Sequence, residues 1–220
     1  LVQLGQRVFQ DVRETVGAIT DRTRALRGTL RISGGMTVCL YVLPPLLKQL
    51  RRAHPALDVR LTVATAERSV HEIRAGRVDA GLLTLPIEES DLETVPAMRE
   101  ELLLVMPTGH ALAGRRSVAA ADLAGQPFVL FELGSATRRV IDRFFASETI
   151  EPTVVMDTEN VEIIKAMVKT GLGIGIVPYQ SIAREVRAGQ LACARVEGHE
   201  LIRETGWVYA RANRTPRAIR

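Results

Sequence analysis

Cysteine and aromatic residues are scarce in this chain of 220 residues. Its two cysteines, Cys39 and Cys193, lie far apart, and neither belongs to a CxxC pair. This spacing argues against a disulfide framework and against a zinc site, and it favours a reducing compartment. Both cysteines are expected to be small apolar residues of the interior. Aromatic residues make up 4% of the chain, too few for a platform that stacks nucleic-acid bases.

Long hydrophobic runs are also absent. No apolar stretch has the length that a membrane-spanning helix requires, and the first residues are amphipathic, unlike a signal peptide. The formal net charge is only +4 and the arginine pairs are dispersed, so the sequence has no footprint of nucleic-acid binding. With 46% hydrophobic and 25% charged residues, the composition is that of a soluble globular protein with one large or two small domains.

Catalytic motifs are missing as well. The sequence contains no GxSxG, HExxH or GxxxxGK[ST] motif. Its four histidines fall at a predicted helix end, inside a helix or in loops, and none lies beside a serine or cysteine at the end of a strand. Asp79 precedes its predicted strand and Asp157 ends one, so the two carboxylates are not expected to pair. We therefore expect neither an enzyme nor a bound metal.

The most informative segment runs from Asn160 to Pro178 and reads NVEIIKAMVKTGLGIGIVP. Apolar residues recur at helical spacing as far as Val168, Gly171 is placed to end the helix, and IGIVP follows as a short strand. Glycines that cradle a phosphate follow a strand and open a helix, whereas these close a helix and open a strand. The GLGIG motif is therefore predicted to serve packing and not nucleotide binding.

The remaining sequence alternates short strands with amphipathic helices, which indicates an α/β fold with parallel sheets. The alternation breaks over a polar, irregular stretch at residues 108–126 and then resumes, which indicates two units. The expected parts are a helix over 1–27, a first lobe over 28–107 plus 204–220, and a second lobe over 108–203. Ligands of such folds bind beyond the carboxyl ends of strands, so we expect a central cleft between the lobes. Strands are predicted at 29–33, 58–64, 79–85, 101–107, 127–131, 153–157, 174–178, 191–196 and 204–211.

Residues 1–26 show a helical pattern with a narrow apolar stripe. No N-cap residue precedes Leu1, so the chain is expected to enter in the middle of a helix. The stripe packs either on its own domain or against a second chain. Pairing with a second chain is favoured, because Gly28 separates this helix from the compact body and an isolated helix buries little. The stripe comprises Leu1, Leu4, Val8, Val12, Val16 and Ile19.

Several motifs, taken in order, resemble the effector-binding domain of LysR-type transcriptional regulators. LVQLGQRVFQ is similar to the start of that family's linker helix, although the family usually has Thr and Ala at the positions of Val2 and Leu4. No single motif is specific, but their common order and spacing cover nearly the whole chain. The other motifs are LRISGG followed by LPPLLKQLRRAHPALDVRL, EIRAGRVDAGLL, LLLVMPTGHALAG and MVKTGLGIGIVP.

The resemblance implies a type II periplasmic-binding-protein-like body of two Rossmann-like lobes, preceded by a long linker helix. It implies a cytoplasmic regulator that forms a homodimer or homotetramer, binds a small-molecule effector, needs no cofactor and has no membrane partner. DNA would be contacted only through a winged helix-turn-helix module ahead of Leu1. Closure of the lobes on the effector would reorient the subunits of the oligomer and so change the contacts of their DNA-binding modules with the promoter. One alternative stays open, a free-standing solute-binding receptor of a transporter, which is expected to be a monomer.

Loops that lead from a predicted strand into a helix are candidates for effector contacts. Their backbone N–H groups and the positive ends of the helix dipoles favour a small carboxylate or other oxyanion. Helix capping without any ligand is the competing explanation, because it selects the same residue types. The candidates are Gly34, Gly35, Met36 and Thr37 in the first loop, Glu132, Gly134 and Ser135 in the second, Thr158 and Asn160 in the third, and Thr65 as a weaker fourth.

Single residues of these loops carry different expectations. The resemblance implies a hydroxyl contact at Thr37 and a polar contact near Thr158, while Thr37 is alternatively an ordinary N-cap. Glu132 does not suit an anionic ligand. It is expected to pair with Arg138 or to face a cationic or hydroxyl part of the ligand.

Overall fold

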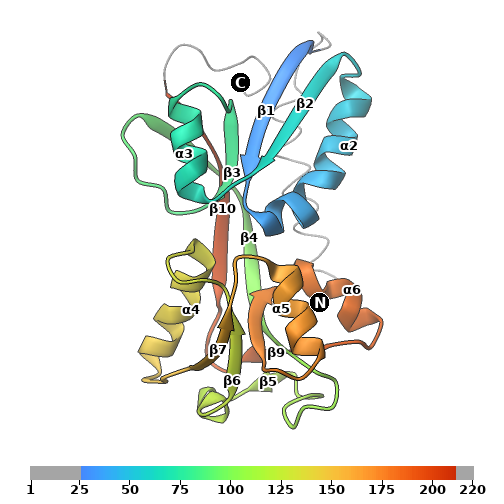
Figure 1. Cartoon of the computed structure of the whole chain (residues 1–220), viewed down its shortest axis with the longest axis vertical. Coiled ribbons are helices and arrows are strands. Elements are labelled where there is room, and N and C mark those ends of the chain that lie inside the picture. The colour runs from blue at the N-terminus through green and yellow to red at the C-terminus, as the bar shows by residue number, and fades with distance from the viewer. Residues whose placement is uncertain (1–25, 212–220) are drawn as a thin grey trace. The chain divides into compact units, whose positions relative to one another are not determined.

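The computed structural model describes residues 26–211, so most of the expected helix over 1–27 and the last nine residues lie outside the described part. The chain divides into two compact units, which are described separately (Figure 1). Unit 1 comprises Leu1–Arg99 and Glu204–Arg220, and unit 2 comprises Glu100–Arg203. Whether these units act as the lobes of a regulator stays a prediction.

The chain passes from unit 1 to unit 2 inside a single strand, β4 (Leu92–Met106). Its second half pairs with other strands of unit 2, which places the division at 99/100 and not at the expected 107/108. The stretch 108–126 belongs to unit 2 and contains the short strand β5 (Ser117–Val118) and a 3₁₀ turn. The chain returns within β10 (Ile202–Ala210), where the division falls at 203/204.

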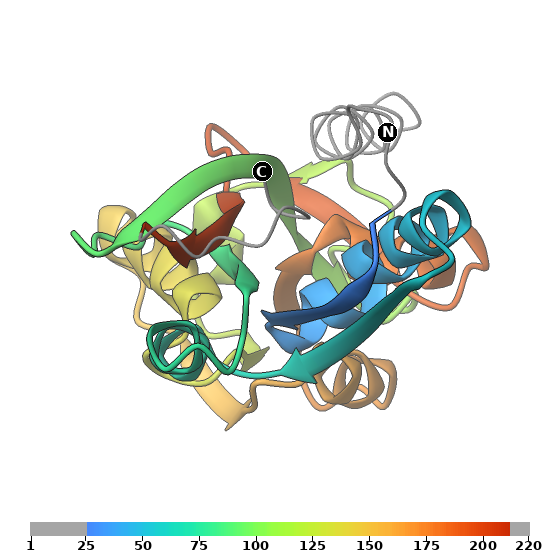
Figure 2. The same cartoon turned by 90° about the horizontal axis from the view of Figure 1, so that it is seen from above.

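Unit 1 is built on a sheet in which β1 (Gly28–Gly34) is central. It pairs in parallel with β2 (Leu57–Val63) and with β3 (Ala80–Thr84), and β10 pairs antiparallel with β3. Figure 2 shows β1 and β2 side by side. Parallel neighbours require crossover connections, and helices supply them here. A π-helical turn, η1 (Val38–Val42), continues into α2 (Leu43–Ala53), and α3 (Ala66–Arg74) follows β2.

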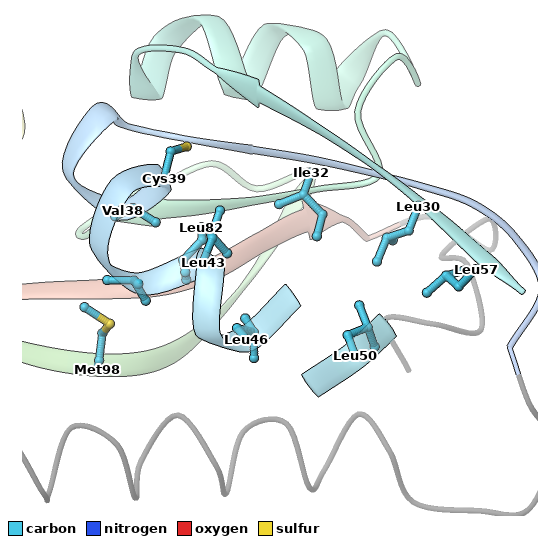
Figure 3. Close-up of a cluster of buried hydrophobic side chains, with 11 residues drawn as sticks. Leu30, Ile32, Val38, Cys39, Leu43, Leu46, Leu50, Leu57, Leu82 and Met98 are labelled. Carbon is cyan, nitrogen blue, oxygen red and sulfur yellow. The ribbon is translucent and has the colours of Figure 1, made fainter. Parts of the chain in front are cut away.

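The core of unit 1 has two parts, one under α2 and one under α3, and alternate strand residues contribute to each. Leu30 and Ile32 pack with Leu50 of α2, and Figure 3 shows the side chains of Leu30 and Leu50 pointing toward one another. On β3, Leu82 belongs to this cluster, while Leu83 packs with α3. The period of two along the strands therefore buries both faces of the sheet.

Unit 2 contains two sets of paired strands. β6 (Pro127–Leu130) pairs in parallel with β7 (Thr153–Asp157), and Figure 1 shows α4 and α5 flanking this pair. β4 pairs antiparallel with β8 and β9, and β5 pairs with β9. Phe128 of β6 meets Phe145 of α4 edge to face, with ring centroids 5.1 Å apart. The remaining elements are α4 (Ala136–Ser147), α5 (Val161–Lys169), β8 (Gly175–Pro178), α6 (Tyr179–Arg187) and β9 (Ala192–Val196).

The segment Asn160–Pro178 has the predicted helix, glycine stop and strand. Gly171 ends α5 with φ +81°, the left-handed conformation expected of a C-cap. A Cβ atom on Gly173 would lie 2.6 Å from the backbone oxygen of Pro127, so only glycine fits between α5 and β6. The glycines pack helix against strand, as predicted.

Within residues 26–211, no helix has both the length and the apolar character needed to cross a membrane.

Candidate functional site

The carboxyl ends of β6 and β7 bring two of the predicted loops together in unit 2. Leu130 is the register partner of Asp157. The backbone N–H of Thr158 donates to the oxygen of Leu130 at 3.1 Å, and that of Glu132 donates to the oxygen of Thr158 at 3.2 Å. These two bonds join the loops side by side, because parallel strands end at the same edge of a sheet.

Each of these loops caps the helix that follows it. The Ser135 hydroxyl accepts from the backbone N–H of Arg138 at 3.1 Å and begins α4. The Asn160 side-chain oxygen accepts from the N–H of Glu162 at 2.9 Å and begins α5, while Thr158 Oγ1 accepts from the N–H of Asn160 at 3.2 Å. The predicted caps at Ser135 and Asn160 are present. Two helix N-termini with their partial positive charges therefore lie at this edge of unit 2, together with the acidic residues Glu132, Asp157 and Glu159.

The charged residues beside Ser135 are arranged differently from the expectation. Arg138 is 6% exposed, and it donates to the Phe131 oxygen at 2.8 Å and to Asp142 Oδ1 at 2.7 Å. The expected pair between Glu132 and Arg138 is therefore wrong, because Asp142 lies one helical turn further along α4 and takes the guanidinium. Arg139 is exposed and donates to the oxygen of Gly134 at 2.5 Å. It is a cation at the mouth of the loop that sequence analysis did not single out.

A second feature that sequence analysis missed lies beneath the first turn of α4. Arg203 donates through Nε to Glu100 Oε2 at 3.1 Å and through Nη1 to Thr137 Oγ1 at 3.0 Å, and Nη2 also bonds to Glu100 Oε2. The side chains of Arg203 and Glu100 are only 3% and 2% exposed. No local pattern could have revealed this pair, because its members are 103 residues apart.

In unit 1, the first predicted loop is less open than expected. The helical segment already starts at Met36, and Thr37 has helical backbone angles, no capping hydrogen bond and 5% exposure. The interpretation of Thr37 as an N-cap is therefore wrong, since a cap needs non-helical angles. The thiol of Cys39 approaches the oxygen of Gly34 at 3.3 Å, whereas the space beside Gly35 is open. Of this loop, Gly35 and Met36 are the more accessible members.

Thr65 lies beside that loop at the end of β2. The N–H of Ala64 donates to the oxygen of Gly34 at 3.0 Å, so the ends of β1 and β2 are joined as in unit 2. Thr65 begins α3, and its hydroxyl accepts from the N–H of Arg68 at 3.3 Å. Thr65 is therefore a capped helix start with exposed backbone N–H groups.

Neither cysteine carries the properties of a reactive thiol. Both are free, Cys39 is buried, and burial raises the pKa of its thiol to about 11. Burial also raises the pKa of Cys193, an effect that the nearby Arg195 partly opposes. The thiolate is the nucleophile and the metal ligand, so both side chains are poor at either task. Among residues 26–211, no three His, Cys, Asp or Glu side chains gather into a group that could hold a metal ion.

Comparison with known proteins supplies the context for these loops. The family described as the LysR substrate binding domain matches residues 23–220. The RuBisCO operon transcriptional regulator of Allochromatium vinosum is 32% identical over 223 residues, which cover 97% of this chain and 73% of that protein. A probable RuBisCO transcriptional regulator of Trichormus variabilis is 29% identical over 220 residues, which are 97% of this chain. The chain spans 65% of the length of that relative.

A solved structure shares the fold. It is the regulatory domain of Synechocystis CcmR in complex with 2-PG, with a TM-score of 0.78 and 23% identity. The match covers 86% of this chain and 90% of that one. The expected fold is thereby confirmed as an α/β fold like that of LysR effector-binding domains.

Proposed function

We propose, from the premise that this chain belongs to the LysR substrate-binding-domain family, that it senses a small oxyanion for a transcriptional regulator. A domain of this family binds a ligand and is not an enzyme, in agreement with the absence of catalytic motifs from the sequence. The relatives reported above are transcriptional regulators, which favours this role over that of a transporter receptor.

The observation that carries the proposal is the joined pair of loops in unit 2. The first turns of α4 and α5 start at the same edge of the β6–β7 pair, and the caps on Ser135 and Asn160 leave further backbone N–H groups of each turn without an intrahelical partner. A carboxylate or phosphate accepts from several such groups at once. Arg139 adds an exposed positive charge beside the loop, and Gly134 allows the close approach of a ligand.

Five predicted contacts in unit 1 belong to the proposal, and they differ in accessibility: Gly34, Gly35, Met36, Thr37 and Thr65. Thr65 starts α3 with exposed backbone N–H groups, and Gly35 and Met36 are partly accessible. Gly34 and Thr37 are buried and are therefore the least accessible of the predicted contacts. The proposed set in unit 2 is Glu132, Gly134, Ser135, Thr158 and Asn160, with Arg139 added. The cleft between lobes that the sequence suggests stays a prediction, as does the absence of a cofactor.

Titration calorimetry on the 220-residue chain tests the oxyanion proposal. The probes are 2-PG, the molecule named with the CcmR structure, together with inorganic phosphate, citrate and an uncharged polyol. We expect at least one oxyanion to bind and the polyol not to bind. Ser135→Ala should weaken binding about tenfold and lower the free energy of unfolding by about 1 kcal/mol, because the cap that orders the first turn is lost.

Ser147→Ala is the matched control, because Ser147 lies at the opposite end of α4 and its hydroxyl donates to the oxygen of Phe144. It should leave oxyanion affinity unchanged. Equal affinities for Ser135→Ala and wild type, with binding intact, would place the ligand away from α4. Absence of binding by every oxyanion would reject an oxyanion effector.

We propose further that the effector signal reaches DNA through a homodimer or homotetramer. DNA contact would be made by a winged helix-turn-helix module joined to this domain, and a cytoplasmic location follows from that role. The edge strands support self-association. On β2, Leu61 and Val63 are 39% and 47% exposed, and on β7, Val154 and Val155 are 38% and 45% exposed. Apolar side chains on edge strands invite a partner.

A further inference from the structure

The buried pair of Glu100 and Arg203 occupies a special place in the chain. Glu100 is the first residue of unit 2 and Arg203 is the last, so the pair ties together the two points at which the chain crosses between units. Beside it, the backbone N–H of Leu102 donates to the oxygen of Leu201 at 2.7 Å. The entry strand and the exit strand of unit 2 are therefore fastened to each other by side chains and by backbone.

Arg203 also reaches a third element. Its Nη1 donates to the hydroxyl of Thr137, which lies in the first turn of α4, two residues after the cap Ser135. All three side chains are buried, with Thr137 6% exposed. The guanidinium thus makes one hydrogen bond to the first turn of α4 and the others to Glu100 on β4.

Stability alone does not account for this arrangement. A buried ion pair gains little net stability, because the cost of removing both charges from water offsets their attraction. Glu100 Oε1 has no hydrogen-bond partner among the described residues, so the pair is not fully satisfied either. The arrangement instead fixes orientation. The planar guanidinium of Arg203 on β10 holds β4, through Glu100, and α4, through Thr137, at set angles to its own strand.

We propose that Arg203 is a positioning residue that couples the first turn of α4 to both chain crossings, with Glu100 and Thr137 as its partners. A ligand that orders this turn would then also order residues 100–103 and 201–203, where unit 2 meets the rest of the chain. The coupling has a regulatory meaning only if the effector binds at α4, so it rests on the proposed function. The coupling through Arg203 itself is a property of the protein without ligand.

Hydrogen exchange, measured by mass spectrometry on the 220-residue chain without ligand, tests the coupling. Thr137→Val keeps the shape of the side chain and removes the acceptor, so it leaves an N–H of Arg203 without a partner. We expect exchange to rise about tenfold in three places, residues 136–139, 100–103 and 201–203, because one buried hydrogen bond limits local opening there. Peptides from α5 and α6 should keep their wild-type rates.

Thr137→Ser is the matched variant, because it keeps the hydroxyl, and it should exchange within about twofold of wild type. Faster exchange in α4 alone would overturn the coupling, and so would an equal rise over all of unit 2, which would mark Thr137 as a general stabiliser. Equal effects of the serine and valine variants would show that the hydroxyl bond is not the link. Since no effector is present, these outcomes are independent of whether an oxyanion binds.

Discussion

Lys165 is a buried cation that joins two helices of unit 2. Its ammonium on α5 lies 2.8 Å from Glu162 Oε1 and 2.7 Å from Glu185 Oε1 of α6, and the lysine side chain is only 4% exposed. Burial by itself raises the pKa of Glu185, but the hydrogen bond from Lys165, a backbone hydrogen bond and the charges of Lys165 and Lys169 together lower it below its usual value of 4.5. The folded state therefore holds this carboxylate ionised more firmly than the unfolded state does.

The lowered pKa of Glu185 gives stability a defined pH dependence. Its contribution is present above the unfolded pKa near 4.5 and is lost as pH falls through the lower folded pKa. Glu185→Gln should reduce the free energy of unfolding by about 1–3 kcal/mol at pH 7, because a charge-assisted bond to a buried lysine is weakened. Urea unfolding at several pH values should show this difference shrinking below pH 4.5.

Glu88→Gln is the control for that series, since Glu88 is an exposed carboxylate of unit 1. It should leave the unfolding free energy unchanged at every pH. A constant difference between wild type and Glu185→Gln from pH 7 to acid would show that the Lys165 bond does not depend on the ionised carboxylate.

At the scale of elements, the contact between α5, β8 and β6 leaves no room for an added methyl group at Gly173. Gly173→Ala forces a methyl group against the backbone of Pro127, which cannot turn aside as a side chain could. We expect a loss of about 3 kcal/mol in the free energy of unfolding, the upper range for an overpacked site. Urea unfolding should show a lower midpoint with an unchanged slope.

Gly109→Ala provides the comparison, because nothing lies within 4 Å of the added carbon and the backbone is not left-handed. It should be neutral or more stable by about 0.5 kcal/mol, since alanine restricts the unfolded chain. Equal midpoints for the two variants would mean that α5 and β6 can separate without cost, and the packing role of the GLGIG motif would then be wrong.

Elements with a local cause were predictable from the sequence. The strand at 153–157 and the caps at Ser135 and Asn160 follow from periodicity and from residue types beside a helix start. Residues 92–100 of β4 were missed because Pro96 and the charged residues Glu93, Arg99 and Glu100 obscure the strand pattern, which tertiary pairing overrides. The π-helical turn at Val38–Val42 was missed because its β-branched and aromatic residues favour strands.

The candidate site also has parts that the sequence predicts and parts that depend on contacts between distant residues. Backbone loops that join β6 to α4 and β7 to α5 could be located from the order of strands and helices. The pair of Arg138 with Asp142 was missed although it has a local cause, because residues four apart on a helix are neighbours and both lie in the predicted helix. The Glu100–Arg203 pair depends on contacts between distant strands, which no periodicity reports.

At the scale of the whole molecule, self-association is the property that the edge strands predict. Leu61 and Val63 share one face of β2, since residues two apart lie on the same side of a strand. Leu61→Lys combined with Val63→Lys should convert the proposed dimer or tetramer into monomer in sedimentation velocity experiments, because two buried lysines would oppose an apolar interface.

Thr62→Lys is the matched control, as Thr62 is exposed on the opposite face of the same strand. It should leave the oligomeric state unchanged. Wild-type protein that sediments as a monomer at high concentration would reject the oligomer and would revive the receptor of a transporter as a role for this fold.

Unit 1 is assembled from two distant parts of the chain, because β10 completes a sheet that began with β1. A ribosome therefore finishes unit 2 while unit 1 still lacks a strand, with Leu83 and its neighbours waiting for Val208. The edge of β3 that pairs with β10 therefore stays open until residues 204–210 have been made. A stop codon just after Arg203 would thus leave unit 2 complete and deprive unit 1 of the strand that closes its sheet.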